Sequence, residues 1–325
     1  MGHSPIRRVH HLIAVVLAVL LGAGPANPGP ARAAGLEQVT GFGTNPGNLV
    51  MYAYRPVGLP AGAPAVVLLH GCTQDAAGYF ANSGWRTFAD RWHFALLLPQ
   101  QQTANNSAAC FNWFLPADTS RGQGEALSIR QMAGYAVATY QIDPARIFVS
   151  GLSAGGAMSA VMLAAYPDVF AAGSIVAGLP YRCATSVLSA TTCQYAPPDR
   201  TPAQWGDLVR AAYPGYRGPW PRVAIWHGQA DYTVVPANGV ELRDQFTDVL
   251  GIPAQPTATR TLPAATTLEV YGADQVRLYR IAGMGHGLPV DPGADPQQCG
   301  NAAAYFLDTI CSAYSDAVFF GLDAH

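Results

Sequence analysis

Three residues of this sequence have types and an order that could perform nucleophilic catalysis: Ser153, Asp231 and His286. Ser153 is the middle residue of Gly151-Leu152-Ser153-Ala154-Gly155, which has the pattern Gly-x-Ser-x-Gly. A serine hydroxyl is a poor nucleophile at neutral pH, so it needs a base within hydrogen-bond reach and a carboxylate that orients the base. Asp231 and His286 follow Ser153 in the order nucleophile, acid, base. We therefore predict a serine hydrolase that works by acyl transfer.

The residues on either side of Ser153 suit a sharp turn between a strand and a helix. An apolar run, 147–150, precedes the pattern, and a stretch rich in small residues, 156–165, follows it. The flanking positions of such a tight turn need glycine because a side chain there would collide with neighbouring backbone. The turn lifts the serine hydroxyl above the sheet, and the N-terminus of the following helix favours a developing negative charge.

The acid and the base each have competitors. Asp231 lies in the loop directly after a predicted strand, and His286 lies in a glycine-rich segment after another predicted strand. The other nearby aspartates lie at a predicted hairpin tip or follow the histidine: Asp274, Asp291 and Asp295. The competing histidines precede every plausible acid or lie at a helix–strand junction: His70, His227 and His93. We therefore expect Asp231 and His286 to complete the triad.

The oxyanion that forms during acyl transfer needs backbone N–H donors. One should come from the residue after the nucleophile, Ala154, and the other from a loop after an early strand. The segment His70-Gly71-Cys72-Thr73 ends such a strand, and we assign the second donor to the amide of Cys72 rather than to its sulfur. Loss of one such donor typically costs about 2.7 to 4 kcal/mol of transition-state stabilisation.

Short apolar runs alternate with helical patterns along most of the chain. This alternation predicts a mostly parallel sheet with helices on both faces and, together with the turn at Ser153, an α/β-hydrolase fold. The predicted strands are 49–55, 65–69, 94–98, 147–150, 172–177, 222–226 and a hairpin of 267–271 with 275–281. The predicted helices are 83–92, 128–140, 156–165 and a last one at 302–313. The Pro-rich stretch 181–221 is the best candidate for an insertion that forms a pocket wall.

Composition and the N-terminus restrict the class of protein. Of the 325 residues, 50% are hydrophobic and 12% are charged, and we expect a single catalytic domain over residues 35–325. Residues 1–34 combine a basic start, a short apolar run and a small-residue segment, as in a secretory signal, and the run is too short to span a membrane. A net charge of −2 offers no basic surface for nucleic acid or an anionic membrane. We expect a secreted, extracellular monomer without nucleic-acid partners or stable membrane anchoring.

Six cysteines follow the predicted signal, an even number that favours disulfide bonds in an exported protein. Two pairs are close in sequence and isolated, which leaves the remaining two cysteines to pair with each other: Cys183–Cys193, Cys299–Cys311 and Cys72–Cys110. No Cys-x-x-Cys spacing occurs and the histidines are not clustered with the cysteines, so we expect no metal site. The triad and the oxyanion donors need no cofactor either.

Aromatic residues near the predicted site are candidates for substrate contact. A Cys72–Cys110 bond would draw the segment 111–114 toward Ser153, which makes Trp113 the first candidate, although a core role suits it equally well. Tyr181 and Trp220, within the predicted insertion, are weaker candidates.

Six short motifs follow one another along the chain. They are LHGCTQ at 69–74, CFNWF at 110–114, GQGEA at 122–126, IDPAR at 142–146, GLSAGG at 151–156 and AGLPY at 177–181. Together they resemble the extracellular polyhydroxybutyrate depolymerase family of esterases, from about Val50 to His286. The resemblance implies a secreted hydrolase that cleaves ester bonds of short-chain polyhydroxyalkanoates through an acyl-enzyme on Ser153.

Other functions stay open on the sequence alone. The wider group that the chain resembles also contains feruloyl and acetylxylan esterases with the same elbow and triad order. A peptidase could use the same triad, and an exported binding protein could keep the fold without activity. Many polymer-degrading members of the family carry a polymer-binding domain after the catalytic one, whereas this chain ends soon after His286. We therefore expect amorphous polymer, oligomers or other esters as substrates rather than crystalline polymer.

Overall fold

The computed structural model describes residues 1–2 and 35–324, so the predicted signal segment falls outside the described residues except for its first two. Residues 35–324 form a ten-stranded sheet in the order β1-β2-β4-β3-β5-β6-β7-β10-β9-β8 and a small sheet of β11 and β12. The strands are β1 (Glu37–Val39), β2 (Val50–Tyr54), β3 (Ala65–Leu69), β4 (Ala95–Gln100), β5 (Ile147–Leu152), β6 (Ala172–Val176), β7 (Arg222–Gly228), β8 (Ala258–Leu262), β9 (Thr266–Tyr271), β10 (Val276–Ile281), β11 (Leu288–Val290) and β12 (Phe306–Asp308). The helices are α1 (Ala76–Asn82), α2 (Trp85–Trp92), α3 (Pro116–Thr119), α4 (Gly124–Tyr140), α5 (Ala154–Ala165), α6 (Val187–Tyr195), α7 (Pro202–Arg210), α8 (Ala237–Val249) and α9 (Ser312–Phe320).

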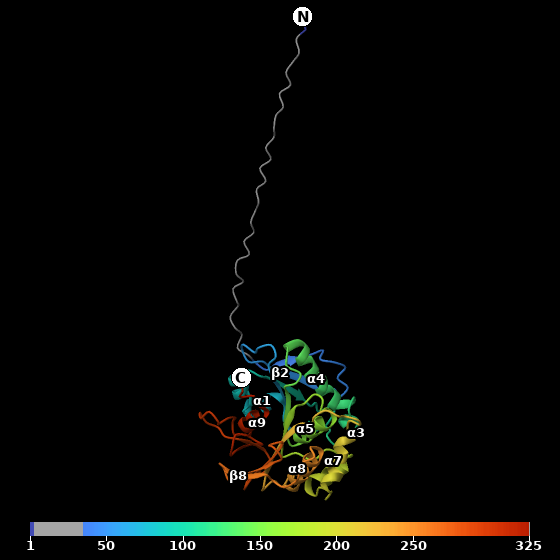
Figure 1. Ribbon diagram of the computed structural model, residues 1–325, viewed down its shortest axis with the longest axis vertical. Coiled ribbons are helices and arrows are strands. Elements are labelled where there is room, and N and C mark those ends of the chain that lie inside the picture. Colours follow the sequence, from blue (N-terminus) through green and yellow to red (C-terminus); the bar gives the residue numbers. More distant parts are fainter. Residues whose placement is uncertain (3–34, 325) are drawn as a thin grey trace. The chain divides into compact units, whose positions relative to one another are not determined.

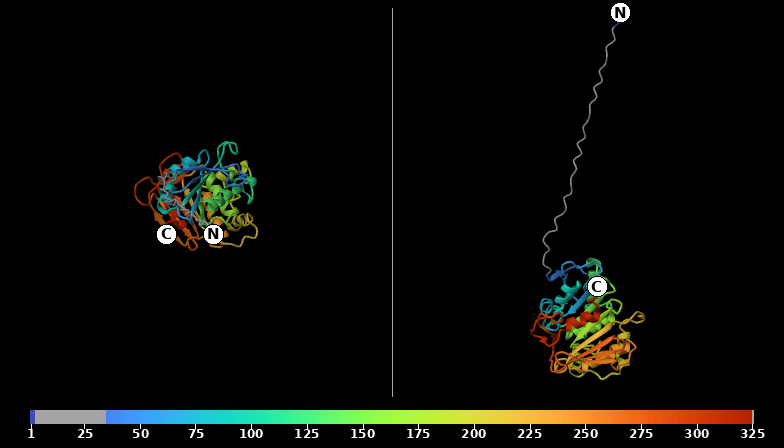
Figure 2. Two further views of the ribbon diagram at one scale, coloured as in Figure 1. Left: turned by 90° about the horizontal axis from the view of Figure 1, so that it is seen from above. Right: turned by 60° about the vertical axis from the view of Figure 1, so that its left-hand side comes forward.

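The central strands of the large sheet, from β4 to β10 in the sheet order, are parallel. Their composition explains this: β3 has the sequence AVVLL and is buried at every position, as a strand covered on both faces requires. Antiparallel strands extend both edges, with β2 and β1 at one edge and β9 and β8 at the other. Because parallel strands end on the same side of the sheet, the segments after β3, β5, β7 and β10 meet there and line one pocket. The right-hand view of Figure 2 shows the green and orange strands of the sheet running side by side.

Helices cover both faces of the sheet (Figure 1). Residues of α4, α5, α7 and α8 belong to the core on one face, and residues of α1, α2 and α9 belong to the core on the other. The strand residues alternate between the two cores, so that Val67 faces one and Val66 faces the other. This is the α/β-hydrolase architecture that the sequence predicts. No helix within residues 35–324 is long and apolar enough to cross a membrane.

The cysteines form the three predicted disulfide bonds. At least one cysteine of each pair lies in a loop just after a strand. The pairs are Cys72–Cys110, Cys183–Cys193 and Cys299–Cys311. The bonds therefore fix loops rather than the central strands.

The end of the chain differs from the prediction. The last helix is α9, Ser312–Phe320, and not 302–313. Most of the predicted range forms a loop and β12, in which Phe306 pairs with Leu288 of β11. This pairing, closed by the Cys299–Cys311 bond, uses backbone groups that a helix would need for itself. The side chain of Cys311 also accepts a hydrogen bond from a backbone N–H in the first turn of α9, so the disulfide marks the start of the helix.

Other helices also extend or add to the predicted pattern. The predicted insertion 181–221 contains α6 and α7, each of which begins with a capping box: Ser186 with Ser189, and Thr201 with Gln204. The structure adds α1, α8 and β8, and it starts α4 at Gly124 rather than at 128. α8 has a weak amphipathic pattern and β8 is a largely exposed edge strand, so neither has a clear hydrophobic pattern in the sequence.

A carboxyl group is buried between α9 and the sheet. Asp316 is 1% exposed, and its Oδ1 accepts a hydrogen bond of 2.8 Å from the indole N–H of Trp226. Burial raises the pKa of Asp316 to about 7, although the hydrogen bond from Trp226 and the charge of Arg277 act against the rise. The folded protein therefore keeps a proton on Asp316 at pH values where the unfolded chain has lost it.

The buried Asp316 should make the stability of the protein fall as pH rises. Below about pH 4 both states hold the proton, whereas between about pH 4 and 7 only the folded state does, so the free energy of unfolding decreases. Asp316→Asn keeps a carbonyl acceptor for Trp226 and removes the titration. Urea unfolding should find the variant equal to the parent near pH 4 and more stable by roughly 2–4 kcal/mol at pH 8. A parent-to-variant difference that is constant over this pH range would contradict the prediction.

Candidate active site

The carboxyl ends of three parallel strands bring Ser153, Asp231 and His286 together. Ser153 follows β5, Asp231 follows β7 and His286 follows β10. His286 Nε2 lies 2.9 Å from Ser153 Oγ, and His286 Nδ1 lies 2.7 Å from Asp231 Oδ2. With a proton on Nδ1, the ring donates to Asp231 and leaves Nε2 free to accept the hydroxyl proton of Ser153. This arrangement can generate a serine nucleophile.

The turn at Ser153 holds its residues in a tightly constrained geometry. Ser153 has φ 58° and ψ −116°, which non-glycine residues rarely adopt. A Cβ added at Gly155 would lie 2.1 Å from the carbonyl oxygen of Leu69, and one added at Gly151 would lie 2.3 Å from the carbonyl oxygen of Gly155. The two glycines therefore allow β3, β5 and the start of α5 to pack in close contact, and this packing fixes the position of the serine hydroxyl.

Both side-chain oxygens of Asp231 have hydrogen-bond partners, one in the loop after β7 and one in the segment after β10. Its Oδ1 accepts hydrogen bonds from the backbone N–H groups of Thr233 and Val234, at 2.8 and 2.9 Å, while Oδ2 faces His286. Burial alone would raise the pKa of Asp231, but the His286 ring and the Val234 amide outweigh burial and hold the pKa below its ordinary value. Asp231 is therefore an ionised carboxylate at neutral pH, as an orienting acid must be.

A second histidine, His227, closes the same loop. Its Nε2 donates to the carbonyl oxygen of Val234 at 2.8 Å, and the side chain is 1% exposed. Burial lowers the pKa of His227, so the ring is neutral, although Nε2 lies only 3.8 Å from Asp231 Oδ2. His227 thus supports the Asp231 loop by a neutral hydrogen bond and does not compete with His286 for the serine.

The backbone amides of Cys72 and Ala154 lie beside the nucleophile. Ala154 is the first residue of α5, where a backbone N–H has no intrahelical acceptor. The Cys72 amide makes no hydrogen bond with any other part of the described chain. Both residues line the same pocket as Ser153, and a disulfide ties Cys72 to Cys110. Two free donors at this position are what an oxyanion hole requires.

A buried network starting at Glu125, near the start of α4, supports the segment that carries Cys72. Glu125 Oε1 accepts a hydrogen bond from the Gln101 side-chain amide at 2.5 Å, and Oε2 accepts one from the Asn112 backbone N–H at 2.8 Å. The Gln101 backbone N–H donates to His70 Nε2 at 3.1 Å, and His70 Nδ1 donates to the carbonyl oxygen of the next residue at 2.7 Å. Burial raises the pKa of Glu125 to about 8 and lowers that of His70, so both groups are predominantly uncharged at pH 7.

Two pockets adjoin at the nucleophile, because both are lined by Ser153, Cys72 and Gln194. The first, which we call the apolar pocket, has a volume of about 180 Å³. Its other walls are mainly apolar and include Trp113, Phe114, Leu179, Val187 and Ala190. The second, which we call the His286 pocket, has a volume of about 160 Å³. Its other walls include Gly71, Thr73, Gln74, Thr233, His286 and Tyr305.

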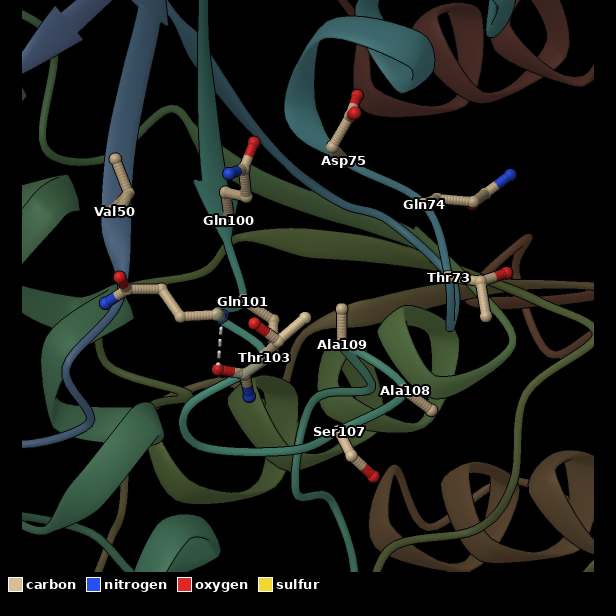
Figure 3. A pocket seen from close by; sticks show the side chains of 11 residues that line it. Val50, Thr73, Gln74, Asp75, Gln100, Gln101, Thr103, Ser107, Ala108 and Ala109 are labelled. Carbon is tan, nitrogen blue, oxygen red and sulfur yellow. Dashed lines mark hydrogen bonds between the residues drawn. The ribbon is translucent and has the colours of Figure 1, made fainter.

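A larger and more open pocket of about 500 Å³ borders the His286 pocket, with which it shares Thr73 and Gln74. Figure 3 shows that side chains from the segment just before α1, from the end of β4 and from the loop after β4 surround it. Most of these side chains are amides, hydroxyls or methyl groups, and none belongs to the triad. This pocket therefore adjoins the site and contains none of the three triad residues.

The structure separates the three aromatic residues that we expected to contact substrate. Trp113 is 6% exposed and lines the apolar pocket. Tyr181 lies in the core instead: its backbone N–H and carbonyl both bond to the side chain of Gln245, and it lines neither pocket at the serine. Trp220 comes just before β7, whereas Asp231 comes just after it. Trp220 therefore lies at the amino ends of the parallel strands, away from the triad at their carboxyl ends. The expectations for Tyr181 and Trp220 are therefore wrong.

Two residues that the sequence did not single out border the nucleophile. Gln194 of α6 lines both pockets, so part of the predicted insertion does form a pocket wall. Tyr305 lines the His286 pocket, and its ring centroid lies 6.2 Å from that of His286. The contacts of Gln194 and Tyr305 depend on how distant parts of the chain pack together. The only sequence signal for them was the presence of cysteines nearby.

The Glu125 network can be tested with two substitutions. Glu125→Gln keeps an acceptor for Asn112, whereas Glu125→Leu leaves that buried N–H unpaired, which costs about 1–3 kcal/mol. We expect urea unfolding at pH 7 to show a loss of this size for the leucine variant relative to the glutamine variant. We also expect the leucine variant to have a lower kcat for a soluble ester with little change in KM, because the network supports the segment that carries the Cys72 oxyanion donor. Equal stability and equal kcat for the two variants would contradict this role.

The family model and the curated relatives that match this chain are depolymerases and esterases. A family model described as "Esterase PHB depolymerase" matches residues 50–270. Poly(3-hydroxyalkanoate) depolymerase C of Paucimonas lemoignei is 53% identical over 88% of this chain and 70% of its own. Acetylxylan esterase of Coprinopsis cinerea is 38% identical over 81% of this chain and 72% of its own.

The fold has a close relative among solved structures. Acetyl xylan esterase from Aspergillus awamori matches with a TM-score of 0.76 and 29% identity, over 89% of this chain and 99% of that protein. The sequence match covers the strands that carry Ser153 and Asp231, and the structural match covers most of the described fold. The chain thus belongs to the PHB depolymerase family of esterases, which are carboxylic ester hydrolases with an α/β-hydrolase fold.

Proposed function

We propose that this protein is a secreted serine esterase that hydrolyses short-chain polyhydroxyalkanoates, such as poly(3-hydroxybutyrate) or its oligomers. The observation that carries the choice of substrate is the 53% identity to a poly(3-hydroxyalkanoate) depolymerase, against 38% or less for the acetylxylan and feruloyl esterases. The predicted export signal and the three disulfide bonds support action outside the cell. The protein is proposed to act as a monomer.

The first half of the reaction forms an acyl-enzyme. His286 Nε2 takes the proton of Ser153 Oγ as that oxygen attacks the ester carbonyl carbon. The carbonyl oxygen becomes an oxyanion that accepts hydrogen bonds from the amides of Cys72 and Ala154. Asp231 stabilises the protonated His286 ring, whose Nδ1 points at Oδ2 over 2.7 Å. His286 then gives the proton to the leaving alcohol, and the carbon–oxygen bond of the ester breaks.

The second half of the reaction releases the acid. Water enters the site of the departed alcohol, and His286 Nε2 takes one of its protons as the water oxygen attacks the acyl carbon. The same two amides stabilise the second oxyanion. The proton returns to Ser153 Oγ as the acid leaves, so the serine is regenerated. Side chains, backbone amides and water supply every group in the cycle, and no metal or cofactor takes part.

The two pockets at Ser153 support a polyester chain as the substrate. His286 must protonate the leaving alcohol, so the His286 pocket would take the alcohol side of the ester and the apolar pocket the acyl side. In a polyester of one hydroxy acid, both sides of the cleaved bond carry the same repeating unit. The two pockets have similar volumes, about 160 and 180 Å³, which supports a substrate with similar groups on both sides of the ester.

The decisive assay compares three ester substrates. The purified mature chain should release 3-hydroxybutyrate from amorphous poly(3-hydroxybutyrate), and Ser153→Ala should lower the rate by roughly 10⁵–10⁶-fold while the protein stays folded. Methyl ferulate and acetylated xylan should be turned over much more slowly. Release of ferulate or acetate alone would replace the polyester by plant polysaccharide esters as the substrate, and activity in the alanine variant would overturn the mechanism.

The role of Asp231 can be separated from a general effect of removing a charge. Asp231→Asn should lower kcat by roughly 10³–10⁴-fold, because the asparagine amide favours the wrong tautomer of His286. Asp274→Asn is the matched control. Asp274 lies at the turn between β9 and β10, at the amino end of β10 and so away from the triad, and it pairs with Arg277. It should keep nearly the parent's activity on a soluble ester. The reverse result would show that Asp231 is not the acid.

A further inference from the structure

The exposed large apolar side chains of this protein gather around the nucleophile. Apart from Met1 and Val57, the described chain exposes only five such residues: Val187, Leu188, Tyr195, Tyr232 and Tyr305. Leu188 and Tyr232 are 81% and 83% exposed. We call these five residues the apolar rim. Exposed apolar side chains that are scattered singly need no explanation, whereas a group of them at one place marks a site of interaction.

Two rim residues line the pockets at Ser153, and the other three are next in sequence to residues that line them. Val187 lines the apolar pocket and Tyr305 lines the His286 pocket. Leu188 follows Val187 in α6, and Tyr195 follows Gln194, which lines both pockets. Tyr232 lies between Asp231 and Thr233, and Thr233 lines the His286 pocket. All five residues therefore line a pocket or are next in sequence to a residue that does.

The structure holds the rim in place, so it does not depend on a flexible loop. The capping box of Ser186 and Ser189 fixes the first turn of α6, which carries Val187 and Leu188. At the other end of α6, the carbonyl oxygen of Gln194 accepts a hydrogen bond of 2.9 Å from the backbone N–H of Val235, in the loop that carries Tyr232. The Cys183–Cys193 bond adds a covalent link. Order in the free protein lowers the entropy that binding would otherwise cost.

Four of the segments around the nucleophile carry no formal charge, and the exposed Asp75, next to Gln74, is the charged residue of the segment after β3. Residues 103–117, 183–198, 232–236 and 299–307 contain no aspartate, glutamate, lysine or arginine. A partner that is anionic, such as nucleic acid or an acidic membrane, would require cationic groups at its contact surface. A partner that is itself uncharged and apolar gains from burying the rim and needs no charge opposite it.

We propose that the apolar rim is a docking surface for solid, water-insoluble aliphatic polyester, so that the protein adsorbs with the Ser153 pockets facing the polymer. This inference rests on the proposed function. The rim continues directly into the two pockets, so a chain at the surface of the polymer can enter them while its neighbours stay in contact with the rim. Val187 and Leu188 favour an aliphatic surface over a hydrated polysaccharide, whose hydroxyl groups would lose hydrogen bonds to water against them.

The test uses a triple variant, Leu188→Ser with Tyr195→Ser and Tyr232→Ser, because these three residues line neither pocket at Ser153. The matched control is Val57→Ser, since Val57 is 58% exposed and lies in the connection between β2 and β3. Adsorption isotherms are measured on amorphous poly(3-hydroxybutyrate) particles and on insoluble xylan. Ser153→Ala is added to every protein so that the particles are not consumed. Each protein with Ser153 intact is also assayed on soluble hydroxybutyrate oligomers.

The proposal predicts that the triple variant adsorbs to the polyester at least tenfold more weakly than the parent. The control should adsorb like the parent, and both variants should keep the parent's activity on soluble oligomers. Unchanged adsorption of the triple variant, an equal loss in the Val57 control, or a loss confined to xylan would each overturn the proposal. Absence of oligomer hydrolysis in the parent would instead refute the proposed function.

Discussion

The close packing of the Ser153 turn against the end of β3 is the constraint on which the site depends. Gly155 approaches the carbonyl oxygen of Leu69 so closely that no side chain fits between them. Because β3, β5 and the start of α5 meet at this point, the serine hydroxyl, the amide of Ala154 and the segment that carries Cys72 are all fixed relative to one another. The positive φ of Ser153 persists because the surrounding sheet leaves the turn no relaxed alternative.

Around this turn, buried polar groups have distinct charge states that follow from their surroundings. Asp231 stays ionised because two backbone amides and His286 outweigh its burial. Burial instead keeps His227 and His70 neutral, so each makes a hydrogen bond of fixed direction to a backbone group. One histidine supports the loop of the acid and the other supports the oxyanion segment. Only His286 is left to exchange a proton with Ser153.

The parts that carry out the chemistry and the parts that would meet substrate have different structural origins. The triad and its supports lie at the ends of buried parallel strands, where packing on both faces of the sheet limits movement. The pocket walls come from α6 and from the segment around Tyr305, which disulfide bonds stabilise and which bear most of the exposed apolar side chains. A common catalytic frame can therefore serve relatives named for different esters, with substrate choice set by the surrounding loops.

The sequence by itself determined the fold class, the order of nucleophile, acid and base along the chain, and the three disulfide pairs. Glycine spacing, apolar runs and cysteine positions are local signals. It also predicted Ser153, Asp231 and His286 as the triad, since each lies in a segment just after a predicted strand, and the structure brings the three within hydrogen-bond distance. Only the tertiary structure decided that Tyr181 is in the core and that Trp220 lies at the amino ends of the parallel strands, away from the triad. It also showed β12 within the range expected to form the last helix. It also brought Gln194, Tyr305 and Glu125 to the site. These outcomes depend on contacts between segments far apart in the chain, and local patterns do not encode which surfaces such segments bury against each other.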